Sequence, residues 1–178
     1  MIHLFHTHAD RTDTAVLLPR AAAEYCAAIG RPCPDLTVSR QPGGKPFFAA
    51  APWLHVSVSH SGAYWICACT DAPIGIDLQR IQPTRTAALA RRFFHPDEIA
   101  WLDAHPDGFF SLWTAKESCV KLTGRGIDGE FSRFSVIRGG SWQSPCPDTV
   151  LRHLPFAAGY VLCLCSADRP LLQKELAR

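Results

Sequence analysis

A strand-length segment near the middle of the chain recurs close to its end. Gly62-Ala-Tyr-Trp-Ile-Cys-Ala-Cys-Thr returns approximately as Ala158-Gly-Tyr-Val-Leu-Cys-Leu-Cys-Ser, which places Tyr64 and Tyr160 96 residues apart. This spacing is close to half of the 178-residue chain, so it favours two similar subdomains. A single short match between apolar strands can also arise by chance.

The remaining sequence mixes strand and helix patterns without a regular alternation of the two. We expect strands over about residues 2–8, 55–59, 64–70, 74–78, 134–138, 149–154 and 160–165, and helices over about residues 14–29, 95–105 and 109–123. No βαβ rhythm is present, so the fold class is α+β. We place an N-terminal subdomain over residues 1–72 and a C-terminal subdomain over residues 73–178.

Composition excludes several classes of protein. Hydrophobic residues make up 47% of the chain and charged residues 19%, which is typical of a globular domain. A net charge of +2 gives no indication of nucleic-acid binding. No apolar run reaches the roughly 20 residues of a membrane span, and the N-terminus lacks the pattern of a signal peptide. We therefore expect a cytoplasmic protein with no membrane partner.

The eight cysteines are expected to be reduced thiols. Cys67 and Cys69 lie in one apolar strand, and Cys163 and Cys165 lie in another. Residues two apart on a strand face the same side, so each pair could chelate zinc together with a histidine of the early HLFHTH segment. The simpler interpretation is that these cysteines are small buried hydrophobic residues. A zinc-binding module therefore remains one functional hypothesis.

The segment GIDLQ presents two oxygen-bearing side chains on one face of a strand. Asp77 and Gln79 are two residues apart, so a hard cation could bind between them. Magnesium takes one or two protein carboxylates and completes its shell with water and phosphate oxygens. Taken alone, GIDLQ would more simply be a turn glycine followed by an aspartate at a strand edge.

The segment WTAKESCVK places an aromatic residue, an acid and an amine on one face of a helix. Trp113, Glu117 and Lys121 follow one another at intervals of four, with Lys116 beside them. A solvent-exposed Glu–Lys pair beneath a core tryptophan is the simpler interpretation. The functional interpretation is an acid that joins a metal site, with two lysines that neutralise a polyphosphate.

Three further segments suit a phosphate ligand. Gly43-Gly-Lys-Pro presents Lys45 from a constrained turn, Ser59-His-Ser-Gly presents hydroxyls and the His60 imidazole at a strand end, and Thr123-Gly-Arg-Gly follows the helix. A lysine in a turn is usually only part of a turn, and an isolated histidine is more often structural. Their combination with GIDLQ and WTAKESCVK favours a phosphate-handling site.

Together these segments resemble the Sfp-type 4′-phosphopantetheinyl transferases. GKP, SVSHSG, GIDLQ, RRFFHPDE and WTAKESCVK occur in that family's order and with similar spacing, from about Gly43 to Gly126. The resemblance implies two related α+β halves about a pseudo-twofold axis, each a small, mainly antiparallel sheet with a packed helix, with coenzyme A between the halves. It implies that a serine of an apo acyl or peptidyl carrier protein attacks the β-phosphate of coenzyme A, receives 4′-phosphopantetheine and releases 3′,5′-ADP.

The resemblance also assigns roles to individual residues. Asp77 and Glu117 bind Mg²⁺, with Gln79 as a third candidate ligand. Glu117 helps to remove the serine proton, directly or through water, and Lys121 stabilises or protonates the departing phosphate. The residues expected to contact the phosphates of coenzyme A are Lys45, Ser59, His60, Lys116 and Lys121. Trp113 is expected to be a packing anchor.

Two departures from the family pattern stand out. Gln79 replaces a glutamate found in many members, and the first half is short, so Arg20, Arg31 and Arg40 are only candidates for gripping coenzyme A. A non-catalytic protein that binds coenzyme A or carrier proteins is the alternative function.

The partner surface and the oligomeric state are also expectations of the sequence. An arginine-rich stretch without acids between residues 79 and 96 is a candidate docking surface for an acidic carrier protein, and it contains Arg80, Arg85, Arg91 and Arg92. Phe93 and Phe94 beside it are either apolar anchors or core residues. Two fused halves make a monomer sufficient.

Overall fold

A computed structural model describes residues 1–8, 14–126 and 130–176 of the chain. Its helices are α1 (Thr14–Ala28), α2 (Thr86–Phe93), α3 (Pro96–Ala104) and α4 (Phe109–Thr123), and a short 3₁₀ turn spans Pro106–Gly108. Its strands are β1 (Ile2–His8), β2 (Val38–Arg40), β3 (Pro46–Phe48), β4 (His55–Ser61), β5 (Tyr64–Thr70), β6 (Ile74–Arg80), β7 (Ile137–Arg138), β8 (Ser141–Trp142), β9 (Val150–Leu154), β10 (Tyr160–Ser166) and β11 (Leu171–Glu175).

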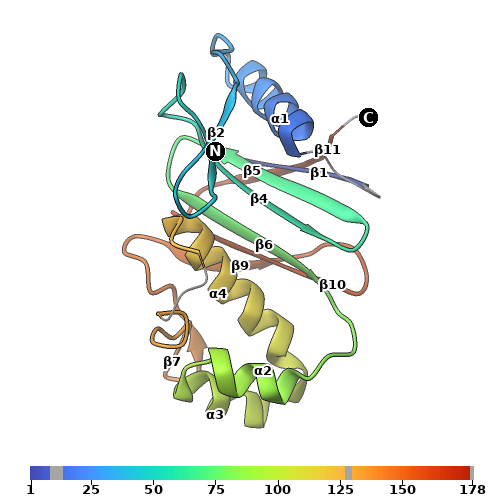
Figure 1. Cartoon of the computed structure of the whole chain (residues 1–178), viewed down its shortest axis with the longest axis vertical. Helices are drawn as coiled ribbons and strands as arrows, with labels where there is room; N and C mark the ends of the chain where they lie inside the picture. The colour runs from blue at the N-terminus through green and yellow to red at the C-terminus, as the bar shows by residue number, and fades with distance from the viewer. Residues whose placement is uncertain (9–13, 127–129, 177–178) are drawn as a thin grey trace.

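Two sheets form the centre of the molecule (Figure 1). The first has the strand order β11-β1-β5-β4 and the second has the order β6-β10-β9. All pairs are antiparallel except β1 with β11. Two small hairpins, β2-β3 and β7-β8, lie outside them.

The two sheets repeat one topology. In the first half β1 is followed by α1 and the hairpin β4-β5, and in the second half β6 is followed by α4 and the hairpin β9-β10. In both sheets the last of these three strands lies between the other two. The recurring segments around Tyr64 and Tyr160 are the central strands β5 and β10, and Tyr64 packs edge-on against Tyr160 with ring centroids 5.1 Å apart. The expected α+β fold of two similar halves is confirmed.

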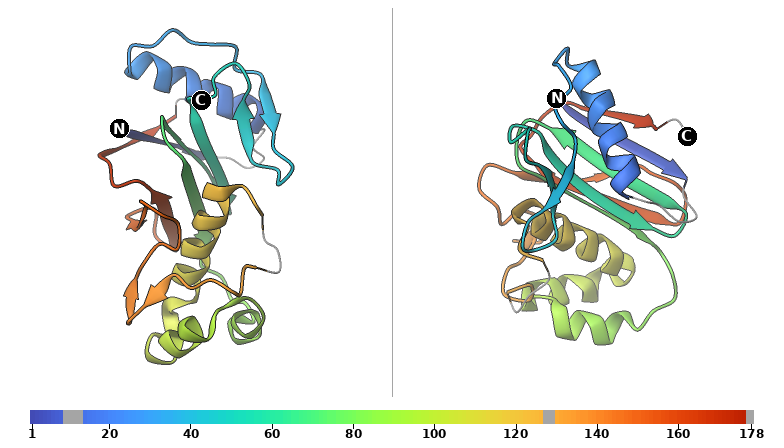
Figure 2. Two further views of the ribbon diagram at one scale, coloured as in Figure 1. Left: turned by 90° about the vertical axis from the view of Figure 1, so that its left-hand side faces the viewer. Right: turned by 45° about the horizontal axis from the view of Figure 1, so that its top comes forward.

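Side chains alternate between the two faces of each strand, so both faces of each sheet are packed. The result is four layers: α1, the first sheet, the second sheet and α4 (Figure 2). One face of the first sheet packs on α1 and includes Phe5, Cys67 and Cys69. Its other face meets the second sheet through a core that contains Ile2, Leu4, Ile66, Ile74, Ile76, Leu78, Leu162 and Leu164. The far face of the second sheet, which carries Cys163 and Cys165, packs on α4. Each cysteine pair therefore faces the helix of its own half.

Serine hydroxyls join the two sheets along the β4–β6 boundary. The backbone amides of Ile76, Leu78 and Arg80 donate to the Oγ atoms of Ser57, Ser59 and Ser61 at 3.0, 3.1 and 2.9 Å. Alternate residues of a strand face the same way, so three serines at every second position satisfy the edge of β6. This contact aligns the SHSG segment with GIDLQ.

The sequence did not predict the short strands β2, β3 and β8, the helix α2 or the strand β11. α2 is only two turns long and follows an exposed segment with Pro83, so its pattern is too short to identify. β11 is almost wholly exposed and pairs with β1, which brings the C-terminal segment into the sheet of the first half. It thus crosses the boundary expected between residues 72 and 73. Within the described part of the chain, no helix is long and apolar enough to cross a membrane.

Candidate active site

Gly75 allows β6 and α4 to touch backbone to backbone. A Cβ atom at Gly75 would lie 1.8 Å from the carbonyl oxygen of Ser118 and 2.5 Å from the amide nitrogen of Leu122. A side chain at this position would therefore force the strand and the helix apart. The glycine of GIDLQ is not in a turn; it lies inside β6, and its lack of a side chain brings Asp77 close to the helix that carries Glu117 and Lys121.

Asp77 is the centre of a hydrogen-bonded cluster drawn from both halves. Its side chain is 2% exposed. Oδ1 accepts hydrogen bonds from Lys121 Nζ at 2.7 Å and from Ser59 Oγ at 2.8 Å, while Oδ2 accepts from Gln79 Nε2 at 3.3 Å. Lys121 Nζ also donates to Ser59 Oγ at 2.9 Å. Four of the residues expected at the site thus contact one another.

Glu117 is a second carboxyl group in the same environment. Burial, the negative charge of Asp77 and a smaller opposing effect of Lys121 combine to raise the pKa of Glu117 to about 7. Such a group changes its protonation state near neutral pH, as a general base requires. Two neighbouring carboxylates are also what a divalent cation needs.

These groups border a cavity of about 350 Å³. The loop before β3, strand β4, helix α4 and the segment after it all contribute to the lining, which includes Gly43, Lys45, His60, Glu117 and Lys121. His60 is exposed at the wall formed by β4. The cavity therefore lies between the first half and α4 of the second.

Lys45 lines this cavity, but its ammonium group is engaged within the protein. Nζ donates to the carbonyl oxygens of Ile74 at 3.0 Å and Leu122 at 2.8 Å, one on β6 and one on α4. Burial lowers the pKa of Lys45 to about 8. Gly43, two residues earlier, lies so close to the end of α4 that a Cβ atom would be 1.9 Å from the carbonyl oxygen of Gly124. The GKP loop thus holds the two halves together at the cavity.

Lys116 lies away from the site. Its ammonium group is fully buried, bonds to Glu98 Oε2 at 2.9 Å and to the carbonyl oxygen of Phe134 at 2.6 Å, and faces the rings of Phe131 and Phe134. One residue along a helix turns the side chain by about 100°, so Lys116 cannot share the direction of Glu117. The expected contact between Lys116 and phosphate is corrected here to a structural ion pair.

Comparison with known proteins identifies the family of the chain. Residues 73–165, more than half of the chain, match the model of the 4′-phosphopantetheinyl transferase superfamily. The chain belongs to this superfamily.

Three relatives illustrate the relationship within the superfamily. A 4′-phosphopantetheinyl transferase of Bacillus subtilis is 39% identical over 133 residues, which cover 72% of this chain and 58% of the relative. The transferase Sfp of Bacillus subtilis strain 168 is 33% identical over 144 residues, 75% of this chain and 64% of the relative. The transferase ffp of Bacillus subtilis is 31% identical over 156 residues, 80% of this chain and 67% of the relative. The matched regions thus cover about three fifths to two thirds of these relatives.

Aromatic packing fixes α4 in this superfamily member. The Trp113 ring lies within 6.4 Å, centroid to centroid, of the rings of Phe93, Phe94, Phe109 and Phe131. Trp113 is therefore the packing anchor that was expected, and Phe93 and Phe94 are part of the core beneath it. Arg80, Arg85, Arg91 and Arg92 are all exposed on the segment from β6 through α2.

Sequence reasoning missed the structural role of Glu98 and the contribution of Ser57 to the cavity lining. Glu98 is fully buried, where Oε2 accepts from the backbone amide of His95 and Oε1 from that of Val136, and the same carboxylate pairs with Lys116. The segment His95-Pro-Asp-Glu could have indicated this role, because an acid three residues after the N-cap accepts a hydrogen bond from the N-cap backbone amide in a capping box. Ser57 was also missed, although the serine at every second position of VSVSHS indicated one face of a strand.

Proposed function

We propose that this protein transfers 4′-phosphopantetheine from coenzyme A to a serine hydroxyl of an apo acyl or peptidyl carrier protein and releases 3′,5′-ADP. The observation that carries the proposal is the meeting of Asp77, Glu117 and Lys121 beside a cavity between the two halves. The relatives are themselves named 4′-phosphopantetheinyl transferases, which supports the same activity.

The site residues have separate roles in the proposed transfer. The Glu117 carboxylate, whose pKa is raised to about 7, takes the proton of the attacking serine hydroxyl. The serine oxygen forms a bond to the β-phosphorus as the bond to the departing 3′,5′-ADP breaks. Lys121 reaches the cavity with an ammonium group that stabilises or protonates the leaving phosphate. Asp77 and Ser59 hold that ammonium in place.

The donor set fits Mg²⁺. Two carboxylates lie close enough for Asp77 to raise the pKa of Glu117, and Lys121 is the cation that faces Asp77. We propose that Asp77 and Glu117 hold the ion, with the Gln79 amide, now beside Asp77 Oδ2, supplying a neutral oxygen or leaving that position to water. When bound, Mg²⁺ supplies positive charge that neutralises the pyrophosphate.

Of the residues expected to grip coenzyme A from the first half, His60 has a free approach to the cavity. We propose that its imidazole contacts a phosphate of the nucleotide. Lys45 and Ser59 have their polar atoms engaged with the second half, so we propose that they position the cavity wall and Lys121.

The carrier protein is proposed to dock on the exposed arginines Arg80, Arg85, Arg91 and Arg92. Carrier proteins are expected to be acidic around the modified serine, so opposite charges would guide the encounter. Because one chain supplies every wall of the site, we propose that a monomer is active. All eight cysteines are free thiols, which supports a cytoplasmic location.

The decisive experiment measures transfer of labelled phosphopantetheine to a panel of apo carrier proteins, with magnesium and with a chelator. We expect magnesium-dependent transfer in the wild type and none in Asp77→Ala, Glu117→Ala or Lys121→Ala variants that stay folded by circular dichroism. A fully active Glu117→Ala variant would overturn the site. Binding of coenzyme A without transfer to any carrier would instead identify a non-catalytic protein.

A matched pair of charge reversals tests the docking surface. Arg91→Glu should raise the KM for the carrier protein while leaving the KM for coenzyme A unchanged, because Arg91 lies outside the cavity. Arg138→Glu reverses an exposed arginine on β7 and should change neither constant. Equal effects of the two substitutions would refute docking at α2.

A further inference from the structure

Three thiols from separate parts of the chain meet on the other side of α4. Cys119 lies on α4, Cys146 lies between β8 and β9, and Cys165 lies on β10, and their sulfur atoms are all within 4.8 Å of one another. Cys119 and Cys165 are 3.8 Å apart, sulfur to sulfur. Among the described residues, this is the group of histidine, cysteine and acidic side chains whose ligand atoms are close enough to hold one ion.

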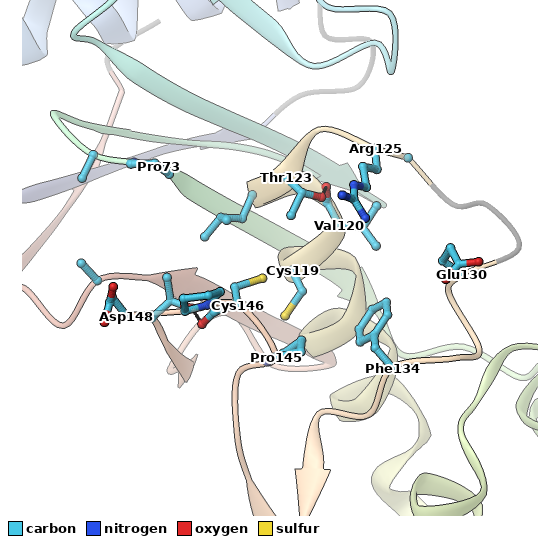
Figure 3. Close-up of a pocket in the computed structure, with 16 residues that line it drawn as sticks. Pro73, Cys119, Val120, Thr123, Arg125, Glu130, Phe134, Pro145, Cys146 and Asp148 are labelled. Atoms are coloured by element: carbon cyan, nitrogen blue, oxygen red, sulfur yellow. Dashed lines mark hydrogen bonds between the residues drawn. The ribbon is translucent and has the colours of Figure 1, made fainter.

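This cluster opens onto a cavity of about 650 Å³, larger than the one at the proposed active site. Cys119 and Cys146 line the cavity, and Figure 3 shows both of their side chains on its wall. Cys146 is half-buried, whereas Cys119 and Cys165 are buried. An ion could therefore reach the cluster without unfolding of the second half.

Polar groups around Cys165 favour its thiolate form. Ser144 Oγ and Thr149 Oγ1 lie 3.5 and 3.6 Å from its sulfur, and Cys119 Sγ donates to it. A thiolate held by donors in advance is a better ligand than a neutral thiol in an apolar core.

The 3.8 Å distance between the sulfur atoms of Cys119 and Cys165 matches the spacing of two thiolate ligands on one soft metal ion. Tetrahedral zinc with Zn–S bonds of about 2.3 Å separates its sulfur ligands by about 3.8 Å. We propose that Cys119, Cys146 and Cys165 bind a thiophilic metal ion of the zinc class, with the fourth coordination position open to the cavity and filled by solvent. Binding releases the remaining thiol protons to solvent and involves no oxidation or reduction.

The other cysteine pair shows why the third thiol matters. Cys67 and Cys69 are 3.7 Å apart, sulfur to sulfur, and both are fully buried beneath α1, but within the described part of the chain no third ligand joins them. The zinc sites considered from the sequence, each a cysteine pair with an early histidine, do not form among the described residues. Cys163, which was expected to share an ion with Cys165, lies outside the cluster and accepts a hydrogen bond from Ser118 instead.

The proposed thiol site is independent of the transferase site. Cys119 is two residues from Glu117 and two from Lys121, which on a helix places it about 160–200° away from both side chains. Magnesium prefers oxygen ligands and does not compete for thiolates. Metal binding by the cysteines and transfer activity can therefore succeed or fail separately.

The test is a cobalt titration of the full chain, reduced with a phosphine, freed of metal by a chelator and handled without oxygen. We expect the near-ultraviolet sulfur-to-cobalt charge-transfer absorption and the visible bands of a tetrahedral ion to saturate at one equivalent of Co²⁺, and one equivalent of Zn²⁺ to abolish them. Excess Mg²⁺ should leave the spectrum unchanged.

Variants locate the ion. Cys146→Ser and Cys165→Ser should abolish the charge-transfer band, and Cys33→Ser, which removes an exposed thiol outside the cluster, should retain it. Cys146 lies in a loop, so its variant stays informative if Cys165→Ser fails to fold. The proposal is refuted if wild-type protein gives no charge-transfer band, if Cys146→Ser binds cobalt as the wild type does, or if mass spectrometry of the reduced protein still finds the cluster joined as a disulfide.

Discussion

The close contact between β6 and α4 predicts that Gly75→Ala, although it adds only one methyl group, lowers both the stability of the fold and the rate of transfer. The new Cβ atom would lie 1.8 Å from Ser118 O, and ordinary contact begins near 3.4 Å, so the two elements must separate by about 1.6 Å. Overpacking of this kind costs about 1–3 kcal/mol of folding free energy, which for a chain of this size lowers the Tm by about 2–4 °C per kcal/mol.

The effect on catalysis should exceed the effect on stability. The hydrogen bond of 2.7 Å from Lys121 to Asp77 spans the same contact, so a larger separation moves the Lys121 ammonium away from its present place beside the cavity. A misplacement of about 1 Å in an active site can lower the rate about 100-fold. We therefore expect kcat/KM for transfer to a carrier protein to fall at least about 100-fold in protein that is still folded.

Gly139→Ala is the matched control. Gly139 has a positive φ of 56°, unlike Gly75, and no atom lies within 4 Å of its added Cβ, so only a backbone strain of about 1–2 kcal/mol is expected. Both variants are compared by thermal unfolding and by steady-state transfer kinetics. If Gly75→Ala loses no more activity than Gly139→Ala, the steric account of GIDLQ is wrong.

Two further predictions concern ionisable groups in the second half. The folded, metal-free protein keeps the Glu117 proton up to a pKa of about 7, against 4.5 in an unperturbed chain. Metal-free protein should therefore lose stability as pH rises from 4.5 to 7, and Glu117→Gln should remove this dependence; an equally steep loss in Glu117→Gln would contradict the assignment. Lys116→Ala leaves Glu98 buried without its partner and should cost about 3–5 kcal/mol of folding free energy, measured by urea unfolding. An increased KM for coenzyme A in stably folded Lys116→Ala would instead indicate a phosphate contact.

Local sequence patterns determined most of the elements that carry the site. The strand that contains Asp77 and the helix over residues 109–123 were predicted, and α4 has these same limits because aromatic and aliphatic residues recur at helical spacing until Gly124 stops it. The repeat around Tyr64 and Tyr160 predicted two similar halves, since it marks the central strand of each sheet. Motif content was sufficient to indicate the family.

Contacts between distant segments decided the rest. Whether Lys45 Nζ meets a phosphate or the carbonyls of Ile74 and Leu122 depends on how the first half approaches α4, which no local pattern specifies. The pairing of β11 with β1 and the meeting of Cys119, Cys146 and Cys165 likewise join residues far apart in the chain. The sequence thus determined which residues were available and which face of each element they occupy. Only the packing of the two sheets on α4 decided which side chains share a site, because a hydrogen bond needs its donor and acceptor within about 3.2 Å and a charge interaction weakens with distance.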